Sequence, residues 1–316
     1  MGYTDDDNPG GTLNAATAAA ASAFKTRAAW TSENKTLSLI SPIWHELFQQ
    51  EKLLIPLTSL YLDFTKNSKE FAILANRVAA AATASTAAVL AANYDFSITE
   101  MKLYIRRVRT TPSVKLAIET KLANGNNAKY PLTNCTLKPY YLDANAKSAT
   151  FENVFASKGI PRFTFVAFTK LDNYRGRYDA NPYIFNHHNL VSLKLTYGAH
   201  SWPSIPLLPK YEEGVNQDYT QAYMNFIQSF KNDNANSILT YKQFRENYCI
   251  YLIDIGKFSS TALDHVTPRI DATARLDVDF LSTVTNSPSL VMLVYTEHDV
   301  TLEIDSARNC TRDYIL

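Results

Sequence analysis

Apolar and polar residues alternate in short runs along the chain, and this period of two limits the fold more than any other feature of the sequence. Apolar side chains occupy every second position in residues 60–64, 191–197 and 274–280. Successive side chains of a strand point to opposite faces, so each run predicts a strand with one buried and one exposed face. Many such strands and no alternation of strands with helices favour an all-β sandwich over a Rossmann or barrel enzyme.

Two other runs, residues 248–253 and 290–295, are apolar at nearly every position. They are typical of central strands that are covered on both faces. Aromatic residues make up 12% of the chain, which also favours β structure because rings pack well on a pleated surface. Further strands are expected at residues 37–40, 71–74, 96–108, 130–142 and 162–168.

A few helices are expected between the strands. Thr111 as a cap, Pro112 in the first turn and Gly125 just past the end predict one helix. A stripe of apolar residues at helical spacing predicts a second helix over residues 215–230. The first helix and the turn-forming residues 124–127 mark the boundary between two halves of the chain.

Charge and cysteine usage exclude several classes of protein. The net charge is +1, so the chain has no overall basic field to hold nucleic acid. The odd number of cysteines, Cys135, Cys249 and Cys310, matches no metal motif and favours folding in the cytosol or nucleus. The acidic, Gly-rich start lacks a signal-peptide pattern, and no apolar run reaches the length of a membrane span, so no membrane contact is expected.

The sequence contains no phosphate-binding loop and no nucleophile elbow. The adjacent His187 and His188, if they lie on a strand, point to opposite faces, so a shared metal ion is not expected. Glu297 and Asp299 share a strand face with His298 on the other side, and exposed strand residues are favoured over an acid–base site. We therefore expect no catalytic, cofactor-binding or metal-binding residues, and no cofactor.

A basic cluster, Arg106, Arg107 and Arg109, lies at the end of the strand predicted at 96–108. Arg107 and Arg109 share a strand face with Leu103 and Ile105, an arrangement that suits phosphate binding or ion pairs at a subunit contact. No pattern of stacking aromatic residues accompanies it, so a subunit contact is favoured over nucleic acid. The Pro-rich residues 202–209 are expected to form a rigid loop that packs on its own sandwich or on a neighbouring subunit.

Several segments occur together in the order and approximate spacing of a known family. The sequences are LYIRRVRTTPSV at 103–114, AKYP at 128–131, LDNYRGRYDANPYIF at 171–185, HNL at 188–190, and YTEHDVTLEID at 295–305 followed by Arg308 and Asn309. On these segments the chain, from about residue 24 to 314, resembles the major capsid proteins of Polinton/Maverick elements and the related adintoviruses, including endogenous copies in animal genomes.

The resemblance implies an all-β double jelly roll, in which two eight-stranded sandwiches stand side by side in one chain. It also implies homotrimeric, pseudo-hexagonal capsomers that tile an icosahedral virion shell with partners such as a penton protein. Such a shell encloses double-stranded DNA, which the subunit contacts only indirectly, and is assembled in the host nucleus or cytoplasm. The family carries no catalytic residues.

Family members look longer at the N-terminal side, so the first jelly roll is expected to be truncated here. The expected division is a flexible segment at 1–30, a partial first jelly roll at 31–127 and a second jelly roll at 128–316. An incomplete sandwich has unpaired edges, which favour aggregation or strand donation by another chain.

Two other functions fit a β-sandwich. One is a carbohydrate- or ligand-binding module, in which exposed Trp202, Tyr183 and Tyr197 stack on sugars. The other is a sandwich hydrolase that uses Glu297 and Asp299. We expect a structural capsid protein rather than an enzyme, with the binding module as the alternative.

Overall fold

A computed structural model describes most of the chain. The described residues are 29–31, 35–43, 45–49, 51–74, 94–143, 145–155, 161, 163–178, 180–212, 217–229, 239–254, 273–283 and 290–314. The predicted flexible segment at 1–30 lies almost wholly outside these residues. Within them no helix is long and apolar enough to cross a membrane.

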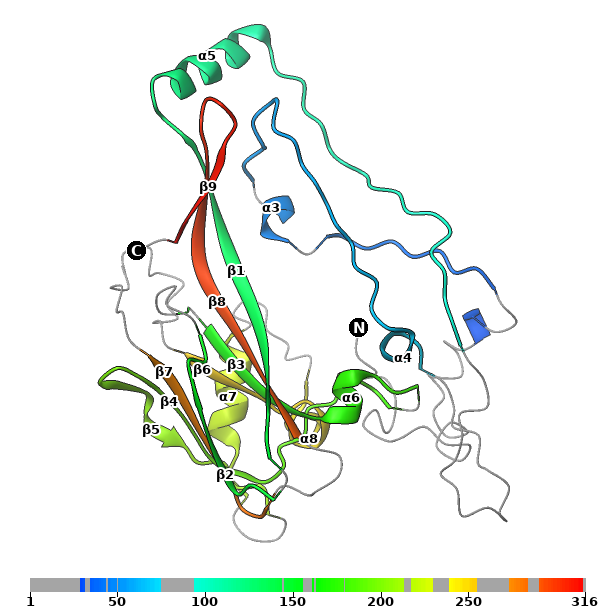
Figure 1. Ribbon diagram of the computed structural model, residues 1–316, viewed down its shortest axis with the longest axis vertical. Coiled ribbons are helices and arrows are strands. Elements are labelled where there is room, and N and C mark those ends of the chain that lie inside the picture. The colour runs from blue at the N-terminus through cyan, green and yellow to red at the C-terminus, as the bar shows by residue number, and fades with distance from the viewer. Residues whose placement is uncertain are drawn as a thin grey trace.

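In the described part of the chain, nine strands form two antiparallel sheets (Figure 1). One sheet has the order β1-β8-β3-β6, with β9 paired to the far half of β8, and the other has the order β2-β7-β4-β5. The bounds are β1 Ala128–Tyr141, β2 Ser148–Glu152, β3 Phe163–Lys170, β4 Leu190–Tyr197, β5 His200–Leu207, β6 Ile250–Asp254, β7 Ala274–Phe280, β8 Leu290–Ile304 and β9 Cys310–Tyr314.

The order of the first eight strands is that of a jelly roll. Strands β1, β8, β3 and β6 make one sheet and β2, β7, β4 and β5 the other, so the chain crosses repeatedly between the two layers. Two interleaved Greek keys of antiparallel strands produce this order. The all-β class and the jelly-roll topology predicted from the sequence are confirmed.

The core lies between the two sheets. The inward side chains of β7, at Ala274, Leu276, Val278 and Phe280, are at most 1% exposed. They pack in one cluster with side chains of the facing sheet, including Phe168 of β3 and others from β8. Burial of each large apolar side chain contributes about 1.5–3 kcal/mol, so this shared core is what holds the two sheets together.

The alternation of apolar residues predicted the buried faces of β4 and β7 correctly, with one exception in β4. Leu193, Leu195 and Tyr197 are buried as expected, whereas Val191 is exposed and Leu190 is buried instead. The pairing with β7 shifts register between Leu190 and Ser192, which indicates a bulge. A bulge inserts a residue and so exchanges the two faces of the strand at that point.

Strand β8 is central, as its apolar run predicts, but β6 lies at the edge of its sheet. Helix α7, Thr220–Ser229, packs against β6. Tyr219, Ala222 and Phe226 of the predicted stripe are buried there. The predicted start of this helix was wrong, because the described residues 217–219 are not helical and Asp218 pairs with Lys210 in an isolated bridge. Residues 215, 216 and 230 of the prediction lie outside the described part.

The Pro-rich residues 202–209, predicted to form a loop, mainly belong to β5. This strand is the outer strand of its sheet. Pro203 and Pro206 have no N–H to donate. They are tolerated there because an edge strand has no hydrogen-bonded neighbour on one of its sides. The prediction of a loop was wrong for this physical reason.

The half of the chain before β1 forms no strand among its described residues. It contains the short helices α3, Glu46–Gln49, and α4, Lys69–Ala72, and the longer α5, Pro112–Ala123, which confirms the predicted helix after Thr111. The predicted strands at 37–40, 60–64 and 96–108 have no strand assignment, and residues 71–72 are helical. Alternation alone does not make a strand, because a strand also needs a neighbour to bond with.

Candidate functional site

Among the described residues, the polar contacts between the N-terminal half and the jelly roll lie at two separate places. The first lies at the tip of a long ribbon. Strands β1, β8 and β9 extend beyond the sandwich, and α5 lies at their far end (Figure 1). Arg308 lies in the turn between β8 and β9 with a φ of 67°, a left-handed conformation that is uncommon outside glycine.

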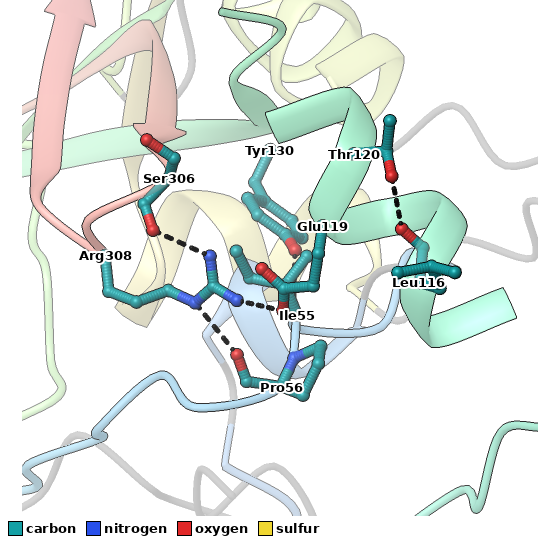
Figure 2. Close-up of polar contacts among 8 residues, drawn as sticks. All are labelled: Ile55, Pro56, Leu116, Glu119, Thr120, Tyr130, Ser306 and Arg308. Atoms are coloured by element: carbon teal, nitrogen blue, oxygen red, sulfur yellow. Dashed lines mark hydrogen bonds and ion pairs between the residues drawn. The ribbon is translucent and has the colours of Figure 1, made fainter. Parts of the chain in front are cut away.

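Arg308 joins three segments that are far apart in the sequence (Figure 2). Its Nε donates to the Pro56 carbonyl oxygen at 3.0 Å, and its Nη2 forms an ion pair with Glu119 of α5. Its Nη1 donates to the Ser306 carbonyl oxygen at 3.2 Å. The Arg308 side chain is only 14% exposed, so these charge-assisted bonds form in a partly desolvated place and are stronger than surface pairs.

Tyr130 of β1 holds the same segment from the other side. Its hydroxyl donates to the Leu53 carbonyl oxygen and accepts from the Ile55 N–H, each at 3.1 Å. Burial raises the pKa of Tyr130, so the hydroxyl keeps its proton for this double role. We call the group formed by Arg308, Glu119, Tyr130 and residues 53–56 the clasp.

The second contact places α4 on the loop after β3. Helix α6, Leu171–Arg175, ends at Gly176, whose φ is 94°. A Cβ at Gly176 would meet the Phe71 backbone nitrogen at 2.6 Å and its Cα at 2.8 Å. Only glycine permits so close an approach of two backbones.

Side chains near Gly176 complete this second contact. The Tyr178 hydroxyl donates to the Tyr94 carbonyl oxygen at 3.2 Å and lies 3.4 Å from Glu70 Oε1. The Phe71 ring packs edge-on against Tyr183 with centroids 5.7 Å apart. We call this contact, with Gly176 at its centre, the α4 seat.

Between the clasp and the α4 seat, the N-terminal half exposes many large apolar side chains. Leu122 is the one residue before Ala128 among the buried hydrophobic residues of the described part. By contrast Leu39, Ile40 and Tyr61 are 83%, 91% and 88% exposed. Others with large exposed surfaces include Leu37, Leu53, Leu57, Leu60, Phe64, Ile98, Met101, Leu103, Tyr104, Ile105 and Val108. Exposed apolar surface of this extent is typical of interaction sites.

The predicted basic cluster lies within this exposed region. Arg106, Arg107 and Arg109 are all exposed on the segment that leads to α5. The segment is drawn out rather than folded into a sheet (Figure 1). The three guanidinium groups are therefore accessible to a partner.

The two adjacent histidines lie in a turn and not on a strand, so the opposite-face argument does not apply to them. His188 and Asn189 have φ values of 45° and 52°. His187 Nδ1 accepts from the Asn189 N–H at 2.9 Å, and its ring stacks on Tyr211 with centroids 4.1 Å apart. Burial, aided by Arg245, lowers the pKa of His187 to about 4, and burial, aided by His187, does the same for His188.

Glu297 and Asp299 do share a face of β8, with His298 buried on the other. Glu297 accepts from the Tyr295 hydroxyl at 2.8 Å, and Asp299 is exposed. His298 packs edge-on against Phe155 within the sandwich, on the far side of the strand from the two carboxylates. No group of three or more His, Cys, Asp or Glu residues that suits a metal ion occurs among the described residues.

The three aromatic residues of the sugar-binding alternative do not form one exposed surface. Tyr197 is 1% exposed in the core, so the expectation that it stacks on a ligand was wrong. Trp202 is partly buried against that core, and Tyr183 packs on Phe71 at the α4 seat. The inward position of Tyr197 follows from the same alternation that buries Leu193 and Leu195.

Sequence reasoning did not identify the clasp or the α4 seat. The bond between Arg308 and Pro56 spans 252 residues, and the one between Tyr178 and Glu70 spans 108. Gly176 was one available signal, since a glycine at the end of a helix often marks a positive φ.

Comparisons with known proteins give a distant set of similarities. No family model matches the chain. An uncharacterized protein of Caenorhabditis elegans, F54H12.2, is 20% identical over 239 residues, which cover 71% of this chain and 53% of that protein. The chain therefore spans about half the length of this relative.

Solved viral structures also resemble part of the chain. The Sputnik virophage structure has a TM-score of 0.39 and 17% identity, and covers 60% of this chain and 39% of its own. The mavirus major capsid protein has a TM-score of 0.34 and 9% identity, with coverage of 60% and 42%. A PBCV-1 virus capsid model has a TM-score of 0.36 and 13% identity, with coverage of 60% and 52%.

Proposed function

We propose that this chain is a structural subunit of a viral-type capsid and not an enzyme. In this role it associates with copies of itself into pseudo-hexagonal trimers of an icosahedral shell, as the resemblance to Polinton/Maverick and adintovirus capsid proteins implies. A penton protein is the expected second partner, and double-stranded DNA is enclosed without a dedicated binding site. The proposed location is the virion, with assembly in the host nucleus or cytoplasm.

One observation carries the proposal: a complete jelly roll is joined to a long segment that exposes its apolar residues. Residues 128–314 contain nearly all of the described buried hydrophobic side chains, whereas the segment before them contributes Leu122. A soluble monomer rarely exposes apolar surface over so many consecutive residues. Burial of that surface against other chains is the simplest way to stabilise it.

The two contacts support a subunit whose parts are fixed for assembly. The clasp and the α4 seat attach the N-terminal half to the jelly roll at two separate points, so the exposed segment has a defined position between them. We propose that residues 31–127 belong to the first jelly roll of a double jelly roll, beside the complete jelly roll at 128–316.

The ionisable groups fit a structural role. Glu297 is bonded to Tyr295, His298 is buried on the opposite face of β8, and both His187 and His188 are held in a closed turn. An acid–base site needs such groups to converge within hydrogen-bond reach of a substrate. The arrangement on β8 instead separates them by the thickness of the strand.

Size-exclusion chromatography with multi-angle light scattering tests the proposal on the 316-residue chain. We expect trimers at micromolar concentration. The variant with Leu39→Asp and Ile40→Asp should dissociate them, because these side chains are 83% and 91% exposed in a single chain and need a partner to be buried.

Ile205→Asp is the matched control. Ile205 is 74% exposed on β5, outside the N-terminal half, and its replacement should leave the trimer intact. A monomer at every concentration contradicts the proposal, and so does an equal loss of association in both variants.

A further inference from the structure

The segment that leads to α5 is an extended strand-like stretch that pairs with no strand among the described residues. Every residue from Ser97 to Thr110 is exposed, and none of them is in a strand. Among the described residues, the ion pair along this stretch is a local one between Lys102 and Glu100, at 2.8 Å. Its alternating residues nevertheless suit a strand that has one apolar and one mixed face.

The same stretch is complementary to itself when it is reversed. Consider two identical antiparallel strands related by a two-fold axis. Residues directly opposite each other lie on the same face of the pair, so one residue must lie opposite its own copy, and the axis passes between these two copies. With the axis at Leu103, Met101 lies opposite Ile105 and Ile98 opposite Val108. Glu100 of each copy then lies opposite Arg106 of the other, so a pair of unlike charges lies on either side of the axis.

Neighbouring positions of the axis are less favourable. An axis at Lys102 places Lys102 opposite itself, and an axis at Tyr104 places Lys102 opposite Arg106, so both oppose like charges. An axis at Met101 pairs Glu100 with Lys102, but it leaves Leu103 opposite Thr99 and Ile105 opposite Ser97. The register centred on Leu103 is the one that matches apolar with apolar and acid with base.

We infer that residues 97–109 pair with the same residues of a second copy as a two-stranded antiparallel ribbon centred on Leu103. The ribbon joins two copies across a two-fold axis and is a contact distinct from the proposed trimer. It supplies the backbone hydrogen bonds that a lone extended segment lacks, and it brings Met101, Leu103 and Ile105 of the two copies into contact on one face. Arg107 and Arg109 lie opposite Thr99 and Ser97, so no like charges meet.

Charge reversal tests the register. Glu100→Arg and Arg106→Glu should each weaken the two-fold contact by about 10-fold, because each variant opposes like charges on both sides of the axis. An equimolar mixture of the two variants should recover the contact, since the substituted position of each chain then faces an unlike charge in the other. The double variant Glu100→Arg with Arg106→Glu should recover it without mixing. Sedimentation velocity measures the association.

Cysteine cross-linking tests the axis directly. In a background with Cys135→Ser and Cys310→Ser, Leu103→Cys places two thiols opposite each other and should give an intermolecular disulfide under mild oxidation. Met101→Cys and Ile105→Cys are matched controls, because their thiols face Ile105 and Met101 of the second copy and should cross-link far less.

The outcomes separate this inference from the proposed function. No cross-link at Leu103→Cys, or a stronger one at Met101→Cys, overturns the ribbon centred on Leu103. Failure of the mixed charge variants to recover association overturns it as well. Light scattering of the same samples shows whether trimers persist, so loss of the two-fold contact can be distinguished from loss of the trimer.

Discussion

Gly176 lies against Phe71 so closely that a Cβ at Gly176 would meet the Phe71 backbone nitrogen at 2.6 Å. The two residues belong to the two halves of the chain, since Phe71 is in α4 and Gly176 follows α6. The close approach fixes where the N-terminal half contacts the jelly roll, and it is possible because glycine has no side chain.

We expect Gly176→Ala to release α4 from its seat. The added methyl group collides with backbone rather than with a flexible side chain, so α4 has to move away. Amide hydrogen exchange of residues 69–72 should become at least about 10-fold faster as the helix opens locally. Gly125→Ala is the control, because Gly125 has a similar φ of 82° but nothing within 4 Å of the added Cβ. Gly125→Ala should lose about 1 kcal/mol of unfolding free energy because of its positive φ. Gly176→Ala should lose more, because its φ of 94° and ψ of 131° lie outside the left-handed helical region, and it alone should accelerate exchange in α4.

Removal of the Arg308 side chain should open the clasp. Arg308→Ala leaves the Pro56 carbonyl and Glu119 without their charged donor, which costs about 1–3 kcal/mol. We expect faster exchange of the Ile55 amide and faster proteolysis of residues 51–57, with little change in the strands of the sandwich.

Arg308→Lys should rescue only part of the effect, because an ammonium group lacks the planar fork that bonds two acceptors. Arg275→Ala, which removes the exposed pair with Asp277, is the control and should change neither measurement.

Cys249 should be chemically inert in the folded chain. It is fully buried, its Sγ lies 3.2 Å from the Tyr211 hydroxyl, and burial raises its pKa to about 12. Because the thiolate is the reactive form, alkylation at pH 8 should modify the exposed Cys135 and Cys310 and leave Cys249 unmodified until the protein unfolds. Mass spectrometry of the alkylated peptides measures this. Rapid alkylation of Cys249 under native conditions contradicts its placement in the core.

Stability should fall as the pH drops from about 6.5 to about 4. His187 and His188 have pKa values near 4 in the folded chain, below the ordinary value of 6.5, so the unfolded chain binds protons first. Stability from the two neutral rings is therefore complete above pH 6.5 and is lost progressively below it, by roughly 2–3 kcal/mol for each histidine.

Urea unfolding at several pH values checks this dependence. His187→Asn keeps an acceptor for the Asn189 N–H but has no titrating ring, so its stability should fall less between pH 6.5 and 4. His200→Asn, at an exposed position, should keep the dependence of the wild type. An unchanged pH dependence in His187→Asn contradicts the assignment.

Sequence reasoning succeeded where local pattern and tertiary environment agree. The alternation of residues 274–280 predicted β7 and its buried face, and the signals at Thr111, Pro112 and Gly125 predicted α5. The same reasoning failed at residues 96–108, where the alternation is equally clear. A strand forms only when another strand lies beside it, and the described part of the chain supplies none there.

The contacts between the two halves were beyond local reasoning for a related reason. Arg308, Tyr130 and Gly176 have ordinary sequence neighbours, and each acquires its role from a partner more than 70 residues away. The helix-like and strand-like periods report which face of an element is buried, but they carry no information on which distant segment meets a given turn.

Cryo-electron microscopy of the purified 316-residue chain tests the capsid role most directly. We expect closed particles in which three copies surround a common axis, with the exposed segments at 35–64 and 96–108 buried between chains and paired as strands. Isolated jelly rolls at high protein concentration, with those segments still facing solvent, would contradict it.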